Sequence, residues 1–448
     1  MLAAQLGVGA DLRIGKAAVK ITPPHGMPMA GYYSIRLAES THDDLFAKAI
    51  VFEYAGAKAA IVACDLVDVE RQYVTEARRL IEAATGIRGA NVSISATHSH
   101  TGPLLSPRFL AAVEGAPLKL ARDYREALPA KIAESVKLAN TNLTEARLWA
   151  GLGVEETVGF NRRFLMKDGS VKFNPGKMNP EIVQPVGPVD PDVYVVYAES
   201  PAGKPLATHV NFAMHLDTVG GVQYSADYPY TIARMLGQIK GPEMLTLFTI
   251  GAAGNVNHID VKTKDRQQGP AEAQRIGTIL AGETIKTYAR MKPVAPGPVR
   301  VKNEIVRIPL PEVKPEQIAA AKQTAARFGK PNQPPFLEMV EAMKVLDVAE
   351  RKRDLLEAEV QVILIGDLAY VSLPGEIFTE LGIAIKKASP YPLTIVSELA
   401  NGSIGYVPNR KAYAEGAYEV ISARCGPGCG EALADAAIRL LADMKRGR

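Results

Sequence analysis

Residues 91–103 read Asn-Val-Ser-Ile-Ser-Ala-Thr-His-Ser-His-Thr-Gly-Pro, and they carry the strongest signal in the chain. Asn91–Ala96 is a run of Val, Ile and Ser that predicts a β-strand. Residues two apart in a strand point to one face, so His98 and His100 are expected to face the same way. The Gly-Pro pair then ends the strand. Two imidazoles at a strand end are either a corner of a metal site or two polar residues satisfied by their neighbours.

The sequence on both sides of this stretch alternates between strand and helix patterns. Arg71–Thr85 has apolar residues at helical spacing and stops at Gly86, which predicts a helix between two strands. The alternation favours an α/β class with a mixed β-sheet core and flanking helices. Strands are expected at Lys48–Glu53, Ala59–Cys64, Arg147–Val154, Val193–Glu199, Ala207–Ala213, Leu245–Ile250, Glu359–Ile365 and Leu368–Leu373, and further helices at Tyr124–Ala139, Ala271–Met291, Pro315–Phe328, Phe336–Glu359, Ile377–Lys387 and Glu431–Met444.

Two segments look different from this core. Residues 160–192 are rich in Gly, Pro and Asn and are expected to form a long irregular loop. The charged helices within residues 312–358 are expected to form an insertion or lid on the core. We therefore expect residues 1–448 to form a single large catalytic domain.

Composition excludes several classes of protein. The 448 residues carry 52 Lys+Arg against 48 Asp+Glu and contain no long basic run, so no nucleic-acid footprint is visible. No segment approaches 18 consecutive apolar residues, which argues against a transmembrane helix. The first residues lack the basic and apolar regions of an intact signal peptide. The sequence does not indicate an oligomeric state.

The three cysteines leave an alternative open. Cys64 lies in an apolar strand-like run and is expected to be a small buried residue. Cys425 and Cys429 bracket Gly-Pro-Gly, a spacing that permits either a local disulfide or two free thiols. A zinc ribbon would need a second cysteine pair, which three cysteines cannot supply.

Four further positions are candidates for chemistry. His215 follows a predicted strand and is either a hydrogen-bonded core residue or a second metal ligand. Glu376, in Pro374-Gly375-Glu376, is either a ligand or a first-turn glutamate favoured by the helix dipole. Arg162 lies in a predicted loop and is either solvated or an anion clamp. Tyr406, in a Gly-rich segment, is typical of packing when taken alone.

Taken in order, these pieces resemble the neutral (non-lysosomal) ceramidase family. The resemblance runs from about residue 13 to the C-terminus. Its marks are 15–23 (Gly-Lys-Ala-Ala-Val-Lys-Ile-Thr-Pro), 29–32 (Met-Ala-Gly-Tyr), 42–49 (His-Asp-Asp-Leu-Phe-Ala-Lys-Ala), 97–103, Asn161-Arg162, His215, Ala253-Gly254-Asn255, Pro374-Gly375-Glu376 and the segment Asn401…Tyr406…Tyr418-Glu419.

The resemblance implies one catalytic zinc ion per chain, held by His98, His215, Glu376 and Tyr406. It places His100 outside the ligand set, facing the substrate, and implies that Arg162 and Tyr418 line the site. The family cleaves the N-acyl amide of ceramide, a reaction of sphingolipid metabolism. Its members are mostly secreted or membrane-facing, which implies a secreted or periplasmic protein, although no intact export signal is visible.

Two departures from the family pattern concern the substrate. The family carries a serine proposed to act in catalysis, and that position corresponds to Asn257. A C-terminal immunoglobulin-like domain is also not expected, since the chain ends at Arg448 soon after the Tyr segment. A role that needs a hydroxyl group is lost, whereas hydrolysis by a metal-activated water survives.

The sequence thus predicts a zinc-dependent hydrolase acting on a small-molecule or lipid-like amide. One alternative is an ester or lactone hydrolase that uses the same metal and water. Another is a non-catalytic binding protein on the same scaffold, which the loss of the serine at Asn257 would favour.

Overall fold

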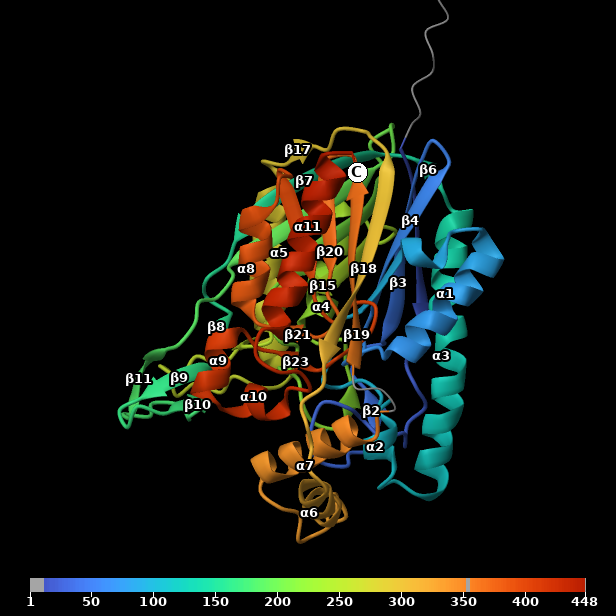
Figure 1. The fold of residues 1–448 in the computed structure, drawn as a ribbon. Helices are drawn as coiled ribbons and strands as arrows, with labels where there is room; N and C mark the ends of the chain where they lie inside the picture. The colour runs from blue at the N-terminus through green and yellow to red at the C-terminus, as the bar shows by residue number, and fades with distance from the viewer. Residues whose placement is uncertain (1–11, 352–354, 448) are drawn as a thin grey trace, which may run out of the picture.

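The computed structural model describes residues 12–351 and 355–447 and contains three main β-sheets with helices on their outer faces (Figure 1). Each of these sheets combines antiparallel with parallel pairs. The predicted α/β class with a mixed-sheet core is therefore confirmed. Residues 1–11, on which the export-signal prediction rests, lie outside the described residues.

The first sheet carries the strand that leads into the two-histidine motif. Its order is β5-β4-β3-β1-β6, and helices α1 and α3 pack together over it. Helix α1 ends as predicted, at Gly86, whose φ of 71° and N–H bond to Glu82 form a left-handed C-cap. The bounds are β1 Arg13–Lys20, β3 Phe46–Tyr54, β4 Ala57–Cys64, β5 Val92–Ala96, β6 Thr144–Glu145, α1 Arg71–Thr85 and α3 Gly115–Thr141.

The second sheet has the order β15-β13-β12-β7-β17, and helices α4 and α5 cover it. Helix α4 was not expected from the sequence. It begins at Tyr228 because the Asp227 side chain accepts the N–H of Tyr228 as an N-cap. The bounds are β7 Arg147–Val154, β12 Asp192–Glu199, β13 Pro205–Phe212, β15 Leu245–Ile250, β17 Lys292–Pro293, α4 Tyr228–Lys240 and α5 Pro270–Tyr288.

The third sheet has the order β18-β19-β20-β22 and packs against helices α8 and α11. The tight turn at Gly366 returns the chain from β19 to β20, as the sequence predicts. The bounds are β18 Val299–Pro309, β19 Leu355–Ile365, β20 Leu368–Ser372, β22 Leu393–Ser397, α8 Thr379–Ala388 and α11 Cys429–Lys445.

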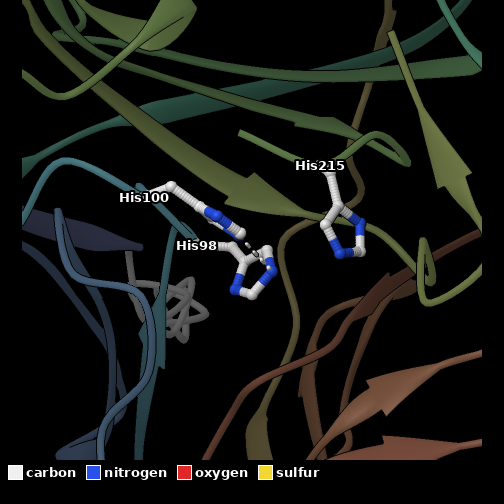
Figure 2. A group of neighbouring side chains, drawn as sticks. All are labelled: His98, His100 and His215. Carbon is white, nitrogen blue, oxygen red and sulfur yellow. Dashed lines mark hydrogen bonds between the residues drawn. The ribbon is translucent and has the colours of Figure 1, made fainter. Parts of the chain in front are cut away.

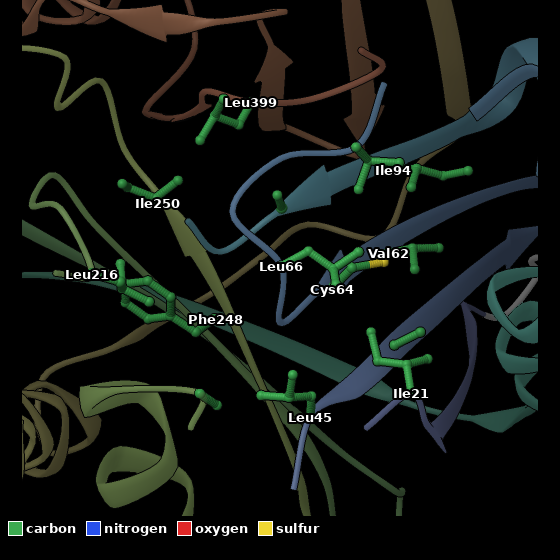
Figure 3. Close-up of a cluster of buried hydrophobic side chains, with 14 of the residues drawn as sticks. Ile21, Leu45, Val62, Cys64, Leu66, Ile94, Leu216, Phe248, Ile250 and Leu399 are labelled. Atoms are coloured by element: carbon green, nitrogen blue, oxygen red, sulfur yellow. The ribbon is translucent and has the colours of Figure 1, made fainter. Parts of the chain in front are cut away.

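The three sheets share a buried core. Phe52 of β3, Val196 of β12 and Ile363 of β19 belong to one apolar cluster, so the sheets face one another. The neighbouring residue Val51 points the other way, into a second cluster beneath α1 and α3, as the two-residue period of a strand requires. Figure 3 shows part of this second cluster. In it the loop residues Leu216 and Leu399 belong to the same cluster as Ile94 of β5 and Phe248 of β15. The loops that carry the candidate site therefore rest on a packed base.

The expectation of an irregular loop over residues 160–192 was wrong. Strands β9 (Arg163–Met166), β10 (Val171–Phe173) and β11 (Ile182–Pro185) form a small three-stranded sheet there. The three strands are only 3 to 4 residues long, so the Gly, Pro and Asn of the segments between them dominated the composition.

The helical insertion is also shorter than expected. Helix α6 spans Pro315–Ala325 and helix α7 spans Phe336–Ala349, whereas residues 355–359 belong to strand β19. The charged residues there alternate with apolar ones along an edge of the sheet, which the sequence pattern did not separate from a helix. Residues 352–354 of the expected insertion lie outside the described part of the chain.

Short elements complete the fold, and most of them surround the candidate site. They are β2 Ser40–Thr41, β8 Phe160–Asn161, β14 Gln223–Tyr224, β16 Val256–Asn257, β21 Glu376–Ile377, β23 Tyr406–Val407, α2 Pro107–Leu110, α9 Arg410–Glu415 and α10 Tyr418–Ser422. Cys64, Cys425 and Cys429 are buried free thiols. None of the described helices combines the length and apolar character that a membrane crossing requires.

Candidate functional site

Two loops that follow neighbouring sheets bring the histidines together. Strand β5 ends at Ala96, and the backbone turns at His98, whose φ is 75°. The N–H groups of His98 and Ser99 both bond to the carbonyl of Leu66, at 2.9 and 3.1 Å. Ser99 then pairs in parallel with Leu216. His98 therefore lies beside the residue before Leu216, which is His215.

His98 and His100 do lie close together, as predicted, but the reason predicted for it was wrong. His98 and His100 lie beyond the strand, so strand alternation does not set their directions. The turn does so, and their ring centroids are still 4.7 Å apart. His215 likewise lies three residues beyond the end of β13.

Backbone carbonyls orient two of the three imidazoles. His98 Nδ1 lies 2.8 Å from the carbonyl oxygen of Val67, and His215 Nδ1 lies 3.0 Å from that of Ala253. Each carbonyl accepts a hydrogen bond from Nδ1–H, which leaves Nε2 as the bare nitrogen. Figure 2 shows the rings of His98 and His215 turned toward the same space, with centroids 4.5 Å apart.

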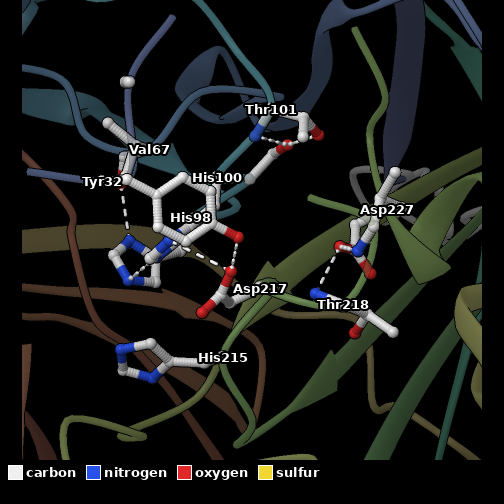
Figure 4. Close-up of polar contacts among 12 residues, drawn as sticks. Tyr32, Val67, His98, His100, Thr101, His215, Asp217, Thr218 and Asp227 are labelled. Carbon is white, nitrogen blue, oxygen red and sulfur yellow. Dashed lines mark hydrogen bonds and ion pairs between the residues drawn. The ribbon is translucent and has the colours of Figure 1, made fainter. Parts of the chain in front are cut away.

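His100 completes the cluster, and its other nitrogen faces a carboxylate. Its Nε2 lies 3.2 Å from His98 Nε2, and its Nδ1 lies 3.5 Å from Asp217 Oδ1. The hydroxyl of Tyr32 donates to the same carboxylate (Figure 4). Burial lowers the pKa of His100, and that of His215, well below 6.5, so both rings are neutral near pH 7.

Glu376 and Tyr406 enter the site side by side. Strands β21 and β23 are parallel, and Glu376 is paired with Tyr406 in their register. Glu376 Oε2 lies 3.2 Å from His215 Nε2 and 3.5 Å from His98 Nε2. The Tyr406 hydroxyl oxygen lies 3.4 Å from His215 Nε2. The four residues predicted as ligands thus converge on one point.

Arg162 supports the Tyr406 side of the site. Its Nη2 donates to the Tyr406 hydroxyl at 2.9 Å, and its Nε donates to Glu419 at 2.9 Å. Burial alone would lower the pKa of Arg162, but Tyr406 and Glu419 outweigh burial and raise it. Burial raises the pKa of Tyr406, and Arg162 opposes that rise. The ring of Tyr418 stands edge-on to Tyr406 at 5.2 Å.

Three supporting residues were missed from the sequence. Asp217 and Tyr32 hold the outer side of His100, and Glu419 holds Arg162. Asp217 had a visible signal, because His98-x-His100 and His215-x-Asp217 share one spacing and the two loops run in parallel. Tyr32 and Glu419 lie in segments that marked the family resemblance, but neither had been given a role in the site.

Asn257 lies in the buried strand β16 next to the His215 loop. Its amide nitrogen donates to Asn174 Oδ1 at 3.2 Å, and its Oδ1 accepts the N–H of Ile259 at 3.1 Å. Both ends of the side chain therefore hold neighbouring loops. The residue has a structural use here and offers no hydroxyl nucleophile.

A cavity of about 150 Å³ opens onto these residues. Its lining also includes apolar and aromatic side chains and polar ones, namely Leu104, Leu105, Phe109 and Tyr33, and Ser403, Ser422 and Arg424. Larger cavities of about 670 and 710 Å³ lie elsewhere, near Tyr230 and His25. Neither is lined by a residue of the histidine cluster, so cavity size does not locate the chemistry.

The donor set suits a metal ion. The ligand nitrogens of His98, His100 and His215 lie within 4.8 Å of one another and could hold one. Glu376 Oε2 is buried and has no hydrogen-bond donor among the described residues. A buried carboxylate oxygen without a donor is costly unless a cation compensates it. Neutral imidazoles and one carboxylate are the ligands that Zn²⁺ prefers in hydrolytic sites.

Two solved structures share this fold. The neutral ceramidase from Pseudomonas aeruginosa superposes with a TM-score of 0.77 at 18% identity, covering 98% of this chain and 75% of that one. A ceramidase complexed with C2 gives 0.75 at 17% identity, covering 98% and 76%. The resemblance to neutral ceramidases is thereby confirmed at the level of the fold. Comparison of the sequence with protein-family models and with curated proteins finds no match.

Proposed function

We propose that this protein is a zinc-dependent hydrolase that cleaves a linear N-acyl amide with water. The observation that carries the proposal is the buried Glu376 Oε2, which faces the bare Nε2 atoms of His98 and His215 and has no donor among the described residues. Both similar structures are of ceramidases, which agrees with this chemistry.

We assign the metal to His98, His215, Glu376 and Tyr406. A bound zinc ion would polarise the amide carbonyl and lower the pKa of a bound water toward about 7. His98 and His215 are already aimed by backbone carbonyls. Arg162 holds the Tyr406 oxygen and helps to balance negative charge on it.

The other polar residues serve the acyl transfer. His100 has Nε2 toward the site and Nδ1 toward Asp217, so we expect its neutral ring to accept a proton from the attacking water and to pass it to the leaving nitrogen. We expect the hydroxyl of Tyr418, which lines the cavity, to donate to the oxyanion that develops on the carbonyl. Water adds its oxygen to the acyl carbon, the C–N bond breaks, and the amine leaves with the proton.

A non-catalytic binding protein is the second candidate, and the position of Asn257 favours it. Both ends of that side chain are occupied by loop contacts, so Asn257 cannot replace a serine hydroxyl. Both candidate functions use the same pocket, but only the hydrolase turns its ligand over.

Metal analysis and turnover test the proposal in sequence. Tag-free protein should contain about one zinc per chain, and His98→Ala and His215→Ala should lose it, whereas His100→Ala should keep the metal and lose turnover. His25→Ala, which changes an exposed histidine, is the matched control and should keep both. Equal metal loss in the His100 variant would overturn its place outside the ligand set. Bound zinc without cleavage of any N-acyl amide would favour the binding protein.

A further inference from the structure

The cavity at the candidate site is small for a lipid. Its volume of about 150 Å³ is half the lower end of the range usual for ligand pockets, roughly 300–1,000 Å³. The cavity also exposes charged groups, Asp68 and Arg424 among them. A long acyl chain would have to displace side chains or leave the cavity, and it would lie beside charges.

An arc of aromatic rings closes the cavity on the side of the helical insertion. The ring of Tyr418 packs against Phe336, the first residue of α7, in a tilted arrangement at 5.2 Å, and Phe336 meets Tyr33 edge-on at 5.5 Å. Tyr33 in turn meets Phe109 at 5.3 Å. Tyr418, Tyr33 and Phe109 line the cavity, whereas Phe336 lies behind this lining, in contact with both Tyr418 and Tyr33. Phe336 therefore holds the rings of Tyr33 and Tyr418 in the wall of the cavity.

Polar contacts fix the insertion in this position. Arg424, which lines the cavity, donates from Nε to Asp347 of α7 at 2.5 Å. Arg108 of α2 pairs with Glu350 at 2.6 Å, just beyond α7. Gln333, just before α7, donates to the backbone carbonyl of Tyr33 at 2.9 Å. In Figure 1, α7 lies directly below α10, which begins at Tyr418. The wall is thus tied to the core on several sides.

We propose that the site accepts N-acyl amides with a short acyl chain, and that Phe336 sets the limit by closing the wall between Tyr33 and Tyr418. This inference rests on the proposed amide hydrolysis. The acyl group lies against Leu104, Leu105 and Phe109, and the polar amine half faces Ser403 and Arg424. Phe336 is a positioning residue, because it acts through the rings of Tyr33 and Tyr418.

The test uses ethanolamides with acetyl, butyryl, octanoyl and dodecanoyl chains and measures release of the amine by the zinc-loaded protein. Wild-type kcat/KM should be highest for acetyl or butyryl and at least tenfold lower for octanoyl. Phe336→Ala should raise the octanoyl-to-butyryl ratio at least tenfold, mainly through KM, and Phe336→Leu should lie between. Leu337→Ala is the matched control, since Leu337 is the next residue of α7 and is equally exposed, at 42%. Its ratio should stay at the wild-type value.

Failure of this inference is distinct from failure of the proposed function. The chain-length limit is overturned if the wild-type protein cleaves the dodecanoyl ethanolamide as fast as the butyryl one. It is also overturned if Phe336→Ala leaves the octanoyl-to-butyryl ratio of kcat/KM unchanged. Either result leaves the proposed amide hydrolysis in place. If no ethanolamide is cleaved, the proposed function fails, and calorimetric binding of the same amides to chelator-treated protein decides the inference. Binding of butyryl and exclusion of dodecanoyl upholds it; any other binding result overturns it.

Discussion

Replacing Gly254 by alanine should disrupt the candidate metal site without unfolding the protein. A Cβ atom at Gly254 would lie 2.8 Å from the carbonyl carbon of Glu376 and 3.0 Å from that of Ile377, and closer still to the Glu376 carbonyl oxygen. Its φ lies outside the left-handed range, so alanine meets no conformational barrier there. The effect is therefore one of space alone, and it falls on the strand that delivers Glu376.

The size of the effect follows from these contacts. Ordinary contact begins at 3.4 Å, so 3.4 − 2.8 leaves a displacement of at least 0.6 Å for the Glu376 backbone. Metal–ligand distances tolerate only about ±0.2 Å. Since Gly254 supports the backbone of Glu376, one of four proposed ligands, we expect affinity for zinc to fall roughly 10- to 100-fold, the loss usual when a group that positions a ligand is changed.

Competition with a chelating dye measures that affinity, and far-UV circular dichroism reports the fold. The control is Gly282→Ala, on the exposed face of α5, where a Cβ would have nothing within 4 Å. That variant should bind zinc like the wild type and gain up to about 1 kcal/mol of stability from helix propensity. A folded Gly254→Ala protein with wild-type zinc affinity would refute the placement of Glu376 in the site.

Two further predictions concern stability. Burial lowers the pKa of His209 to about 3, so the native state resists protonation and stability is lost as the pH falls from about 6.5 toward 3. Between pH 7 and pH 5 this costs about 2 kcal/mol, and His209→Gln should lack that loss in urea titrations; a wild-type-to-variant difference that is the same at both pH values would contradict it. Glu359→Gln should cost about 3–5 kcal/mol because it leaves the buried guanidinium of Arg78 without its charge partner, bonded at 2.9 and 3.0 Å. Glu76→Gln, in a fully exposed pair with Arg79, should leave the free energy of unfolding almost unchanged in the same titration.

The sequence pattern predicted those features that depend on interactions between residues close together in the chain. Helix α1 begins and ends where its apolar spacing and Gly86 indicated, and β5 was one residue shorter than expected. His98, His215 and Glu376 were candidates because each follows a predicted strand, and the family resemblance then implied that they are ligands. The structure brings all three within 3.5 Å of a neighbour in the set.

The remaining features depend on contacts between distant segments. Tyr406 is beside Glu376 only because β21 and β23 pair in parallel, and no pattern around Tyr406 encodes that register. The direction of His98 comes from a turn held by Leu66, about thirty residues earlier, and not from strand alternation. The sheet of β9, β10 and β11 was hidden because its turns supply most of its glycine and proline. Such pairings become visible only once the chain is folded.

The site should keep its shape when the metal is removed. His98 holds a positive φ, a strained conformation for a residue with a side chain, and the bonds from His98 and Ser99 to Leu66 hold it there. Carbonyl acceptors fix the rings of His98 and His215, and Arg162 fixes Tyr406, through bonds between protein groups only.

Because these bonds already orient the ligands, zinc is not needed to order the chain, unlike in a zinc finger. We expect chelator-treated protein to retain its far-UV circular dichroism and to unfold cooperatively. Zinc at about 1,000 times its dissociation constant should then raise the unfolding free energy by about 4 kcal/mol through binding alone. Loss of the native spectrum on chelation would mean that the metal, and not the Leu66, Val67 and Ala253 carbonyls, organises the site.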